Sequence, residues 1–309
     1  MSIRFDERVA IVTGAGAGLG RAHALGLAAR GAKVVVNDPG VATDGTGASG
    51  SVAEKVVAEI RAAGGQAMAH SANVTDMAAV QDMVDQAIGE WGRVDILVNN
   101  AGILRDKSFS KMTLEDFRAV LDVHLMGSVH TTKALWEHFR EREYGRIVFT
   151  TSSSGMFGNF GQANYGAAKT GMLGLMNVLH HEGAKYNIRV NMLSPTAATR
   201  MTEELLPPET LPLLAPDTIT PGLLVLVSED APSKMIMGAG AGCFAEIKVH
   251  ETLGISLADA DLTPESVAAA MARIRDTKGQ VEMPGAFDQT RKYAQMAAHR
   301  RGQGEPWKP

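Results

Sequence analysis

The stretch VAIVTGAGAGLG, Val9–Gly20, decides the fold of this chain of 309 residues. Its first five residues form a short apolar run that ends at a glycine, which is typical of a buried strand. Glycines then recur at Gly14, Gly18 and Gly20, and a helical pattern follows them directly. Because glycines let a backbone approach a pyrophosphate and a helix N-terminus offers free N–H groups, the stretch predicts a nucleotide-binding turn. We expect Gly14, Gly18, Leu19 and Gly20 to contact the cofactor.

Asp38 stands at the end of the next predicted strand, residues 33–37, at about the distance from the glycines that dinucleotide-binding units show. A carboxylate at this place can accept hydrogen bonds from the ribose hydroxyls of the adenosine. Its charge would repel a 2′-phosphate, so Asp38 predicts NAD rather than NADP as the cofactor. The alternative is that Asp38 is only a solvated turn residue before Pro39 and Gly40.

Strands and helices alternate along most of the chain. Apolar runs predict further strands at 66–71, 94–98, 146–151, 188–193 and 234–237, and helical patterns lie at 51–63, 76–90, 113–140 and 163–186. This alternation predicts an α/β fold, a Rossmann-like doubly wound parallel sheet of about seven strands with helices on both faces. Ligands of such sheets bind beyond the carboxyl ends of the strands, where the glycine turn, Asp38, Asn100, Ser152 and Pro195 fall.

The residues with the clearest chemistry are Tyr165 and Lys169, which lie four residues apart and therefore share one face of a helix. The free pKa of tyrosine is about 10, so the phenol needs help to act as an acid or base near neutral pH. A neighbouring ammonium favours the phenolate, and Ser152 supplies a hydroxyl that could hold a substrate oxygen. The alternative is an ordinary helix surface, because this spacing is common by chance.

The composition argues against several classes of function. The chain has 30 basic and 34 acidic residues, a net charge of −4 and no basic stripe, so we expect no nucleic-acid partner. Cys243 is its single cysteine, which suits a reducing compartment. No apolar run reaches membrane length and the first residues do not resemble a signal peptide, so we expect a cytoplasmic protein without membrane contact. His180, His181 and Glu182 lack a further ligand at suitable spacing, so no metal site is predicted.

Together these motifs resemble the short-chain dehydrogenase/reductase family over roughly residues 5–240. The shared motifs are TGxxxGxG from Thr13, NNAG at 99–102, Ser152, and YxxxK from Tyr165. The resemblance implies that Tyr165 is the general acid/base, that Lys169 lowers its pKa and holds the nicotinamide ribose, and that Ser152 orients the substrate oxygen. It also implies a set of cofactor contacts, namely Gly14, Gly18, Leu19, Gly20, Asp38, Asn73, Val74, Asn100, Ala101, Gly102, Tyr165, Lys169, Pro195 and Thr199.

Two positions depart from the family pattern. His124 stands where members often have an asparagine that completes a proton relay, so we place it among the catalytic residues. The departure matters less if the relay uses the main-chain carbonyl at this position, as it does in the family. A helix residue with a merely hydrogen-bonded imidazole is an equal alternative. Asn73 stands where an adenine-contacting aspartate is common, and its side-chain oxygen should preserve that contact.

Three longer stretches resemble one branch of the family, the dehydrogenase domain of peroxisomal multifunctional enzymes of type 2. They are VVVND at 34–38, NNAGILRDKSF at 99–109, and the stretch 144–169. This resemblance implies a NAD-dependent enzyme that interconverts (3R)-3-hydroxyacyl-CoA and 3-oxoacyl-CoA. The alternatives are a 17β-hydroxysteroid dehydrogenase, a 3-oxoacyl-acyl-carrier-protein reductase, which usually takes NADPH, or a nucleotide-binding sensor without catalysis.

Residues 241–309 are expected to form a C-terminal extension of the dehydrogenase domain, residues 1–240, with helices near 264–276 and 284–300. The glycine- and alanine-rich run 238–242 is interpreted as a turn. The extension of about 60 residues is too short to hold a core alone, so it should pack on its own domain or on a partner subunit. The resemblance implies both, in a homodimer.

The surroundings of the substrate are less clear from the sequence. The Pro-rich segment 196–216 occupies the place of the family's lid. Arg105 and Lys107 could bind the phosphates of coenzyme A or pair with acidic residues in loops. Five apolar residues could line an acyl channel or pack beneath the lid: Met201, Leu205, Leu206, Leu211 and Leu213.

Overall fold

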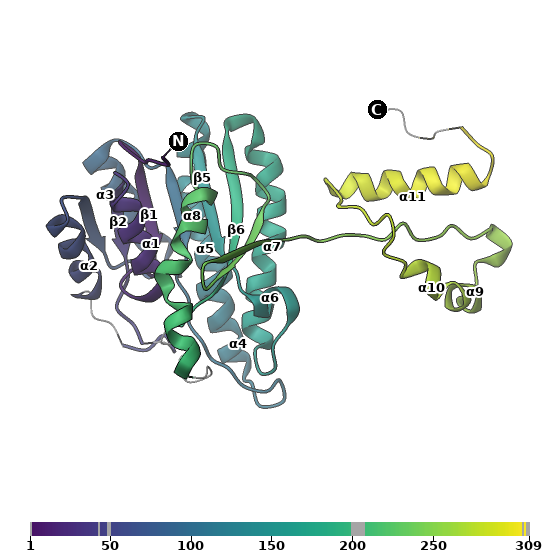
Figure 1. Ribbon diagram of the computed structural model, residues 1–309, viewed down its shortest axis with the longest axis horizontal. Helices are drawn as coiled ribbons and strands as arrows, with labels where there is room; N and C mark the ends of the chain where they lie inside the picture. The colour runs from purple at the N-terminus through teal and green to yellow at the C-terminus, as the bar shows by residue number, and fades with distance from the viewer. Residues whose placement is uncertain (1, 43, 48–50, 199–207, 305, 307–309) are drawn as a thin grey trace. The chain divides into compact units, whose positions relative to one another are not determined.

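The computed structural model describes residues 2–42, 44–47, 51–198, 208–304 and 306. The chain divides into two units, Met1–Glu246 and Ile247–Pro309. The first unit contains the predicted α/β sheet and every residue for which we expect a role in the site (Figure 1).

Eight strands form one sheet in the described part of the chain, in the order β3-β2-β1-β4-β5-β6-β7-β8. The first seven pair in parallel, and the crossover between β1 and β4 marks the point where the strand order reverses. This arrangement confirms the doubly wound fold, in which ligands bind beside that reversal. The strands are β1 Val9–Thr13, β2 Lys33–Asn37, β3 Gln66–His70, β4 Ile96–Asn99, β5 Gly145–Thr150, β6 Ile188–Thr196, β7 Ile236–Gly240 and β8 Cys243–Ile247.

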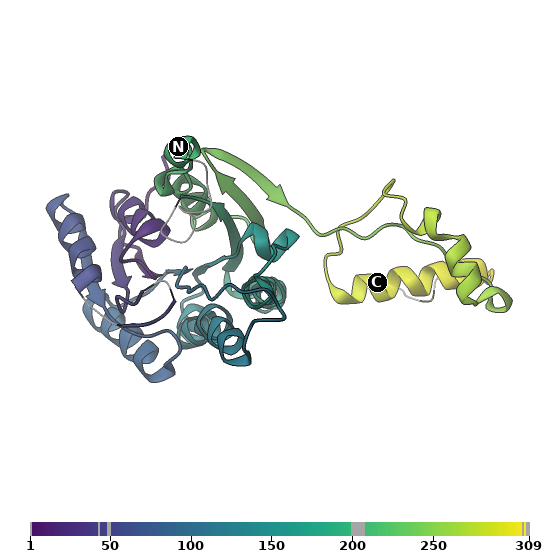
Figure 2. The same cartoon turned by 90° about the horizontal axis from the view of Figure 1, so that it is seen from below.

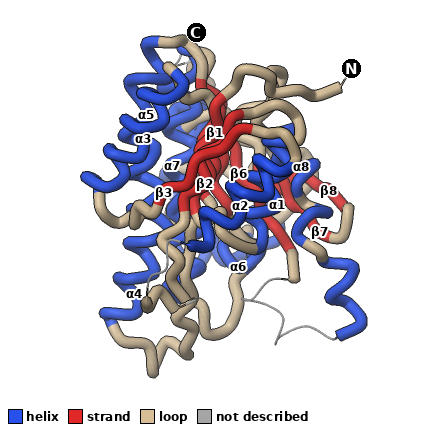
Figure 3. Tube along the Cα trace, turned by 90° about the vertical axis from the view of Figure 1, so that its left-hand side faces the viewer, coloured by secondary structure: helices blue, strands red, loops and turns tan. Residues whose placement is uncertain are grey.

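Helices cover both faces of the sheet, as Figure 3 shows most clearly. Helices α1, α2 and α8 pack on one face, and α3, α5 and α7 pack on the other. The helices of this unit are α1 Gly18–Ala28, α2 Ser51–Ala62, α3 Met77–Trp91, α4 Leu114–Leu121, α5 Gly127–Glu141, α6 Ser153–Phe157, α7 Ala163–Gly183 and α8 Thr220–Leu226.

The central strands are apolar because both of their faces are covered. Every residue of β1, β4 and β5 is buried. On one face the core joins β1 and β2 to α1, α2 and α8 through residues such as Val12, Leu27, Val36, Ile60 and Leu223. At about 1.5–3 kcal/mol for each large apolar side chain removed from water, this burial stabilises the sheet and holds its carboxyl edge in place.

The C-terminal edge of the sheet differs from the expectation. The run 238–242 is not a turn over its whole length, because Gly238 to Gly240 belong to β7 and pair with β6. Only Ala241 and Gly242 form the turn, with φ of +51° and +73°, as a type I′ hairpin requires. A side chain at Gly240 would press on Thr196 of the neighbouring strand, so the glycine reflects close packing. The hairpin adds β8, and the sheet has eight strands instead of about seven.

Three helical segments also differ from the sequence prediction. Helices α6 and α8 were not predicted, and the helix expected over 113–140 is interrupted by a π-helix, η1, at Asp122–Met126. The predicted helix starts at Asp76 and Thr113 are confirmed, because both side chains accept hydrogen bonds from the first turn of the helix that follows.

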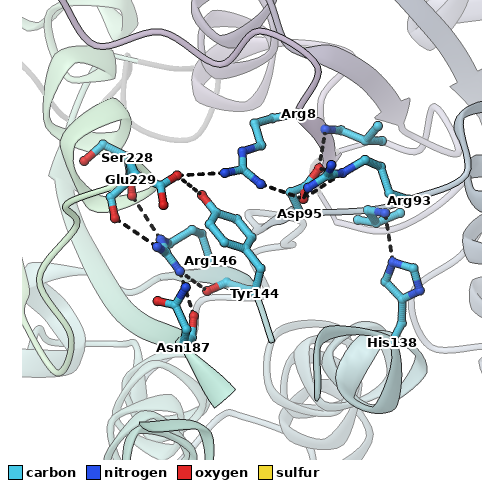
Figure 4. Close-up of polar contacts among 12 residues, drawn as sticks. Arg8, Arg93, Asp95, His138, Tyr144, Arg146, Asn187, Ser228 and Glu229 are labelled. Atoms are coloured by element: carbon cyan, nitrogen blue, oxygen red, sulfur yellow. Dashed lines mark hydrogen bonds and ion pairs between the residues drawn. The ribbon is translucent and has the colours of Figure 1, made fainter. Parts of the chain in front are cut away.

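A polar network joins the amino ends of four strands, at the sheet edge opposite the glycine turn (Figure 4). Arg146 at the start of β5 is fully buried and donates hydrogen bonds to the carbonyls of Gly145, Asn187, Ser228 and Glu229, at 2.8–3.0 Å. Its Cζ lies 4.1 Å from the Tyr144 ring centroid. The network ties β5, β6 and the segment after α8 together, so it is a structural element remote from the candidate site.

The second unit contains helices α9 Pro264–Ala269, α10 Met271–Ile274 and α11 Ala286–Arg300, drawn yellow-green to yellow in Figure 2. Thr263 caps α9, but the helix expected over 264–276 is broken at Ala270. Lys292 of α11 pairs with Glu251 and donates to the carbonyl of Thr252, which fastens the helix to the segment before α9. Ala270 and Ala298 are the buried apolar residues among those described in this unit, so its core is small.

Candidate active site

The glycine turn after β1 has the backbone conformation that the sequence predicts. Gly14 and Gly18 have φ of +64° and +53°, a region that favours glycine. A Cβ on Gly20 would overlap the carbonyl of Gly14, so the first turn of α1 packs directly on the loop. The N-terminus of α1 therefore points free N–H groups at the crevice beside the crossover, as pyrophosphate binding needs.

The NNAG segment after β4 is fastened to the same turn. Asn100 donates from its side chain to the carbonyls of Thr13 and Gly14, at 2.9 and 3.1 Å. The main-chain N–H groups of Asn100 and Ala101 both donate to the Thr13 hydroxyl at 3.0 Å. Thr13 thus joins the glycine turn to the NNAG segment, a role that was not predicted although Thr13 opens the shared motif.

Asp38 lies at the end of β2, next to the glycine turn. Its two carboxylate oxygens accept hydrogen bonds from the main-chain N–H groups of Gly16, at 2.9 Å, and Gly40, at 2.7 Å. The carboxylate therefore contacts the glycine turn and is not merely a solvated turn residue. Each oxygen has a further lone pair, which leaves acceptors for ribose hydroxyls.

The remaining cofactor positions lie on neighbouring segments. The Asn73 side chain closes its own turn by accepting from the N–H and hydroxyl of Thr75 at 3.0 Å, so its oxygen is shared with that turn. Val74 is buried, and its carbonyl contacts His130 Nδ1 at 2.9 Å. Pro195 pairs with Ala239 within the sheet. Thr199 lies outside the described residues, as do Met201, Leu205 and Leu206.

Ser152, Tyr165 and Lys169 come together beyond the end of β5. Ser152 caps α6, and its hydroxyl also makes a side-chain hydrogen bond with Tyr165. Lys169 lies one turn after Tyr165 on α7, with Nζ 5.3 Å from the ring centroid and donating to the Thr150 carbonyl at 2.5 Å. The expected catalytic residues therefore form one cluster next to the cofactor loops.

The electrostatics of the cluster are dominated by burial. Burial raises the pKa of Tyr165 to about 12, against a smaller lowering by the Ser152 hydrogen bond. Burial also lowers the pKa of Lys169 to about 7. With a pKa of about 7, Lys169 carries its positive charge only part of the time near neutral pH, whereas Tyr165 stays a neutral phenol. Lys169 therefore does not by itself depress the Tyr165 pKa as the sequence suggested. Tyr165 still keeps part of its surface accessible.

His124 belongs to this cluster as well. Its side chain is buried, its ring centroid lies 5.1 Å from that of Tyr165, and the two rings are perpendicular. Burial and the nearby charge of Lys169 hold the pKa of His124 well below its usual range. The main-chain carbonyl of His124 accepts a hydrogen bond from the Ser128 hydroxyl at 2.6 Å.

Asn164 is a site residue that the sequence analysis missed. It is fully buried immediately before Tyr165, and its side-chain oxygen accepts from the Tyr165 main-chain N–H at 2.8 Å. Its amide donates to the Arg105 carbonyl at 3.1 Å, which links the start of α7 to the loop after NNAG. Asn164 is the second residue of α7 and not its N-cap, so no local sequence pattern signalled this role.

Arg105 and Lys107 do not point to a phosphate site in this structure. Both pair with Asp116 of α4, at 3.3 and 3.0 Å respectively. Arg105 also donates to the Asp44 carbonyl at 3.0 Å. Both therefore act as loop salt-bridge partners, the second of the two expectations for these residues.

Metal and membrane chemistry find no support in the part of the chain that the structure covers. No cluster of three or more His, Cys, Asp or Glu side chains there could hold a metal ion. Among the described helices, none combines the length and apolar character that crossing a bilayer requires.

A tyrosine, a serine hydroxyl and a lysine beside a dinucleotide turn can move a proton while a nicotinamide ring carries the hydride. Fold and site together thus define an oxidoreductase built on a Rossmann-like sheet. Residues 8–210 match the family model described as short chain dehydrogenase, and the chain belongs to the short-chain dehydrogenase/reductase family.

Sequence similarity to known proteins covers most of this chain. A short-chain type dehydrogenase/reductase of Mycobacterium tuberculosis is 49% identical over 89% of the chain and 96% of its own length. Peroxisomal multifunctional enzyme type 2 of Mus musculus is 46% identical over 89% of the chain, which spans 37% of that protein. The structure of the full-length type 2 enzyme of Drosophila melanogaster superposes with a TM-score of 0.77 and 37% identity, over 93% of this chain and 48% of the other.

Proposed function

We propose that this protein is a NAD-dependent dehydrogenase that interconverts (3R)-3-hydroxyacyl-CoA and 3-oxoacyl-CoA. The observation that carries the reaction type is the cluster of Ser152, Tyr165 and Lys169 beside the glycine turn. The substrate class rests on likeness, because the similarity to the multifunctional enzymes covers 89% of this chain. The chain spans only about a third of that relative, so its other activities are not proposed here.

The preference for NAD rests on Asp38. Its carboxylate contacts the Gly16 N–H at the glycine turn, where an adenosine ribose would lie. A 2′-phosphate there would meet a negative charge with no basic side chain among the contacts that Asp38 makes in the described structure. The positive φ of Gly14 and the close approach at Gly20 fit a bound pyrophosphate.

The side chains of the cluster divide the proton chemistry between them. A bound oxidised NAD would supply the hydride acceptor for C3 of the substrate and a positive charge close to the cluster. Ser152 donates a hydrogen bond to the substrate oxygen and Tyr165 takes the proton from the 3-hydroxyl. Because burial opposes the phenolate, this step needs a positive charge that lowers the Tyr165 pKa, and a bound oxidised nicotinamide would supply one.

We also propose that the protein forms a homodimer. The second unit contains a small core and exposes Leu262, Phe287 and Tyr293, which is unusual for an independent domain of this size. Sedimentation of the intact chain tests it, and a monomer at micromolar concentration would contradict the dimer.

A turnover panel tests the function. The purified chain is incubated with NAD or NADP and with (3R)- or (3S)-3-hydroxyacyl-CoA of several lengths, a 17β-hydroxysteroid, and a 3-hydroxyacyl-acyl-carrier-protein. We expect reduced cofactor from the (3R)-hydroxyacyl-CoA with NAD. Faster turnover of the steroid or the carrier protein would replace the proposed substrate, and NAD binding without turnover of any compound would support a sensor.

A further inference from the structure

His124 sits in an interrupted part of a long helical segment. Between α4 and α5, the π-helix η1 replaces the usual α-helical hydrogen bonds. The Gly127 N–H donates to the carbonyl of Asp122, five residues earlier. A π-turn adds one residue to a helix, and such turns are frequent at functional sites. Here it accompanies a histidine that is only 3% exposed and faces the catalytic cluster.

The imidazole contacts the main chain that follows the NNAG motif. His124 Nε2 lies 2.8 Å from the Ile103 carbonyl and 3.1 Å from the Ile103 nitrogen. A neutral imidazole nitrogen can donate or accept but cannot do both, and the shorter distance favours Nε2–H donating to the carbonyl. A Cβ on Gly102 would overlap the imidazole, so the ring lies directly on this segment.

The same ring contacts the catalytic residues on its other side. It packs perpendicular to the Tyr165 ring at 5.1 Å between centroids, within the range of favourable aromatic pairs. Tyr165 and Lys169 are the titratable groups that face it from α7, and the Lys169 charge opposes protonation of the imidazole. Nδ1 is buried and makes no hydrogen bond within the described residues.

We propose that His124 is a positioning residue, whose Nε2–H holds the Gly102–Ile103 main chain in the cofactor crevice while its ring supports Tyr165. One rigid side chain then sets the distance between the cofactor loop and the general acid/base. The ring does this without exchanging a proton, because a second proton on the imidazole would be opposed by burial and by Lys169. The inference rests on the proposed function for its kinetic readout.

Two variants separate hydrogen bonding from ring packing. His124→Asn keeps a donor and an acceptor for the Ile103 main chain, and His124→Phe keeps a ring without polar atoms. We expect H124F to lower kcat/KM about 10- to 100-fold and to raise the KM for NAD, as the loss of a buried hydrogen bond predicts. H124N keeps the hydrogen bond but loses the ring that packs on Tyr165, so it should lose less than H124F, about three- to tenfold. The exposed control His181→Asn on α7 should be unchanged.

The kinetics of these two variants test the hydrogen-bonding role of His124. Wild-type kcat/KM in H124F, or an equal loss in H124N and H124F, would overturn the hydrogen-bonding role. Thermal unfolding of both variants guards against a merely structural effect, since H124F should lose activity even when its Tm matches that of H124N.

Nuclear magnetic resonance supplies a readout that does not depend on the substrate. Nitrogen-15 shifts of His124 in the wild-type chain should show the Nε2–H form without titration between about pH 5 and 8. An Nδ1–H form, or titration near the free histidine pKa, would overturn the proposal. If no substrate of the panel is turned over but this signature and tight NAD binding are found, only the proposed function fails.

Discussion

The Lys169 ammonium lies 5.3 Å from the Tyr165 ring centroid and donates to the Thr150 carbonyl at 2.5 Å. The lysine is therefore tied to the end of β5, while the tyrosine faces the crevice from the same helix. Burial lowers the Lys169 pKa to about 7 and raises the Tyr165 pKa to about 12. These contacts fix the positions of Lys169 and Tyr165 in the absence of a cofactor. The charge of a bound cofactor would then change the pKa values of the two groups and not their positions.

The phenol of Tyr165 is the group whose removal should stop the reaction. Tyr165→Phe keeps the ring that packs on His124 but removes the acid/base, so turnover should fall about 10³-fold. NAD affinity should change little, because the glycine turn and Asp38 are untouched. Steady-state assays measure the turnover, and fluorescence titration measures the NAD affinity. Tyr293→Phe in the exposed part of α11 is the matched control. Turnover like that of the wild type in Tyr165→Phe would end the acid/base assignment.

The charge of Asp38 should set the cofactor preference. Asp38→Asn keeps one acceptor oxygen for the Gly16 and Gly40 N–H groups but removes the repulsion against a 2′-phosphate. We expect the ratio of kcat/KM for NAD to that for NADP to fall at least about tenfold, which corresponds to about 1.4 kcal/mol. Asp44→Asn in the same exposed loop is the control. An unchanged ratio would show that other residues select the cofactor.

Much of the fold could be predicted because local patterns and tertiary packing agree. The all-buried strands β1, β4 and β5 read as apolar runs, and the glycines of the first turn read as a binding loop. The end of β7 was placed too early because its glycines act in close strand packing, which only the neighbour Thr196 reveals. Small residues in a strand and in a turn look alike in a sequence.

The proximity of the candidate site residues could be predicted from the sequence, but their electrostatics could not. Ser152, Tyr165 and Lys169 were identified by spacing, yet the direction of the Tyr165 pKa depends on how deeply the cluster is buried. The fixing contacts of Thr13 and Asn164 also required tertiary structure, because their partners lie 59 or more residues away. Spacing along one helix is local information, while burial belongs to the whole fold.

Arg146 should contribute to stability and not to catalysis. Arg146→Lys keeps the charge but cannot reach all four carbonyls that the guanidinium contacts. We expect a loss of about 2–4 kcal/mol in the free energy of unfolding, from buried carbonyls left without partners. Denaturant titration measures it, with Arg140→Lys on the exposed part of α5 as a control expected within about 1 kcal/mol. Since the network lies opposite the site, a large change in NAD affinity with unchanged stability would contradict this assignment.

The buried histidine of α1 should make the protein less stable in acid. His23 is fully buried against Thr220 at 3.0 Å, and burial lowers its pKa from 6.5 to about 3. Between these two values the unfolded chain binds a proton that the folded chain does not, so the free energy of unfolding rises with pH through this window. His23 contributes a slope of about 1.4 kcal/mol per pH unit to the free energy of unfolding. That free energy therefore decreases progressively as the pH falls below about 6.5. Urea unfolding between pH 6.5 and pH 4 measures how steeply the free energy of unfolding depends on pH. This dependence should be weaker in His23→Asn than in the wild type, whereas the exposed control His181→Asn should match the wild type. The same slope in all three proteins would mean that His23 does not stay neutral in the folded chain.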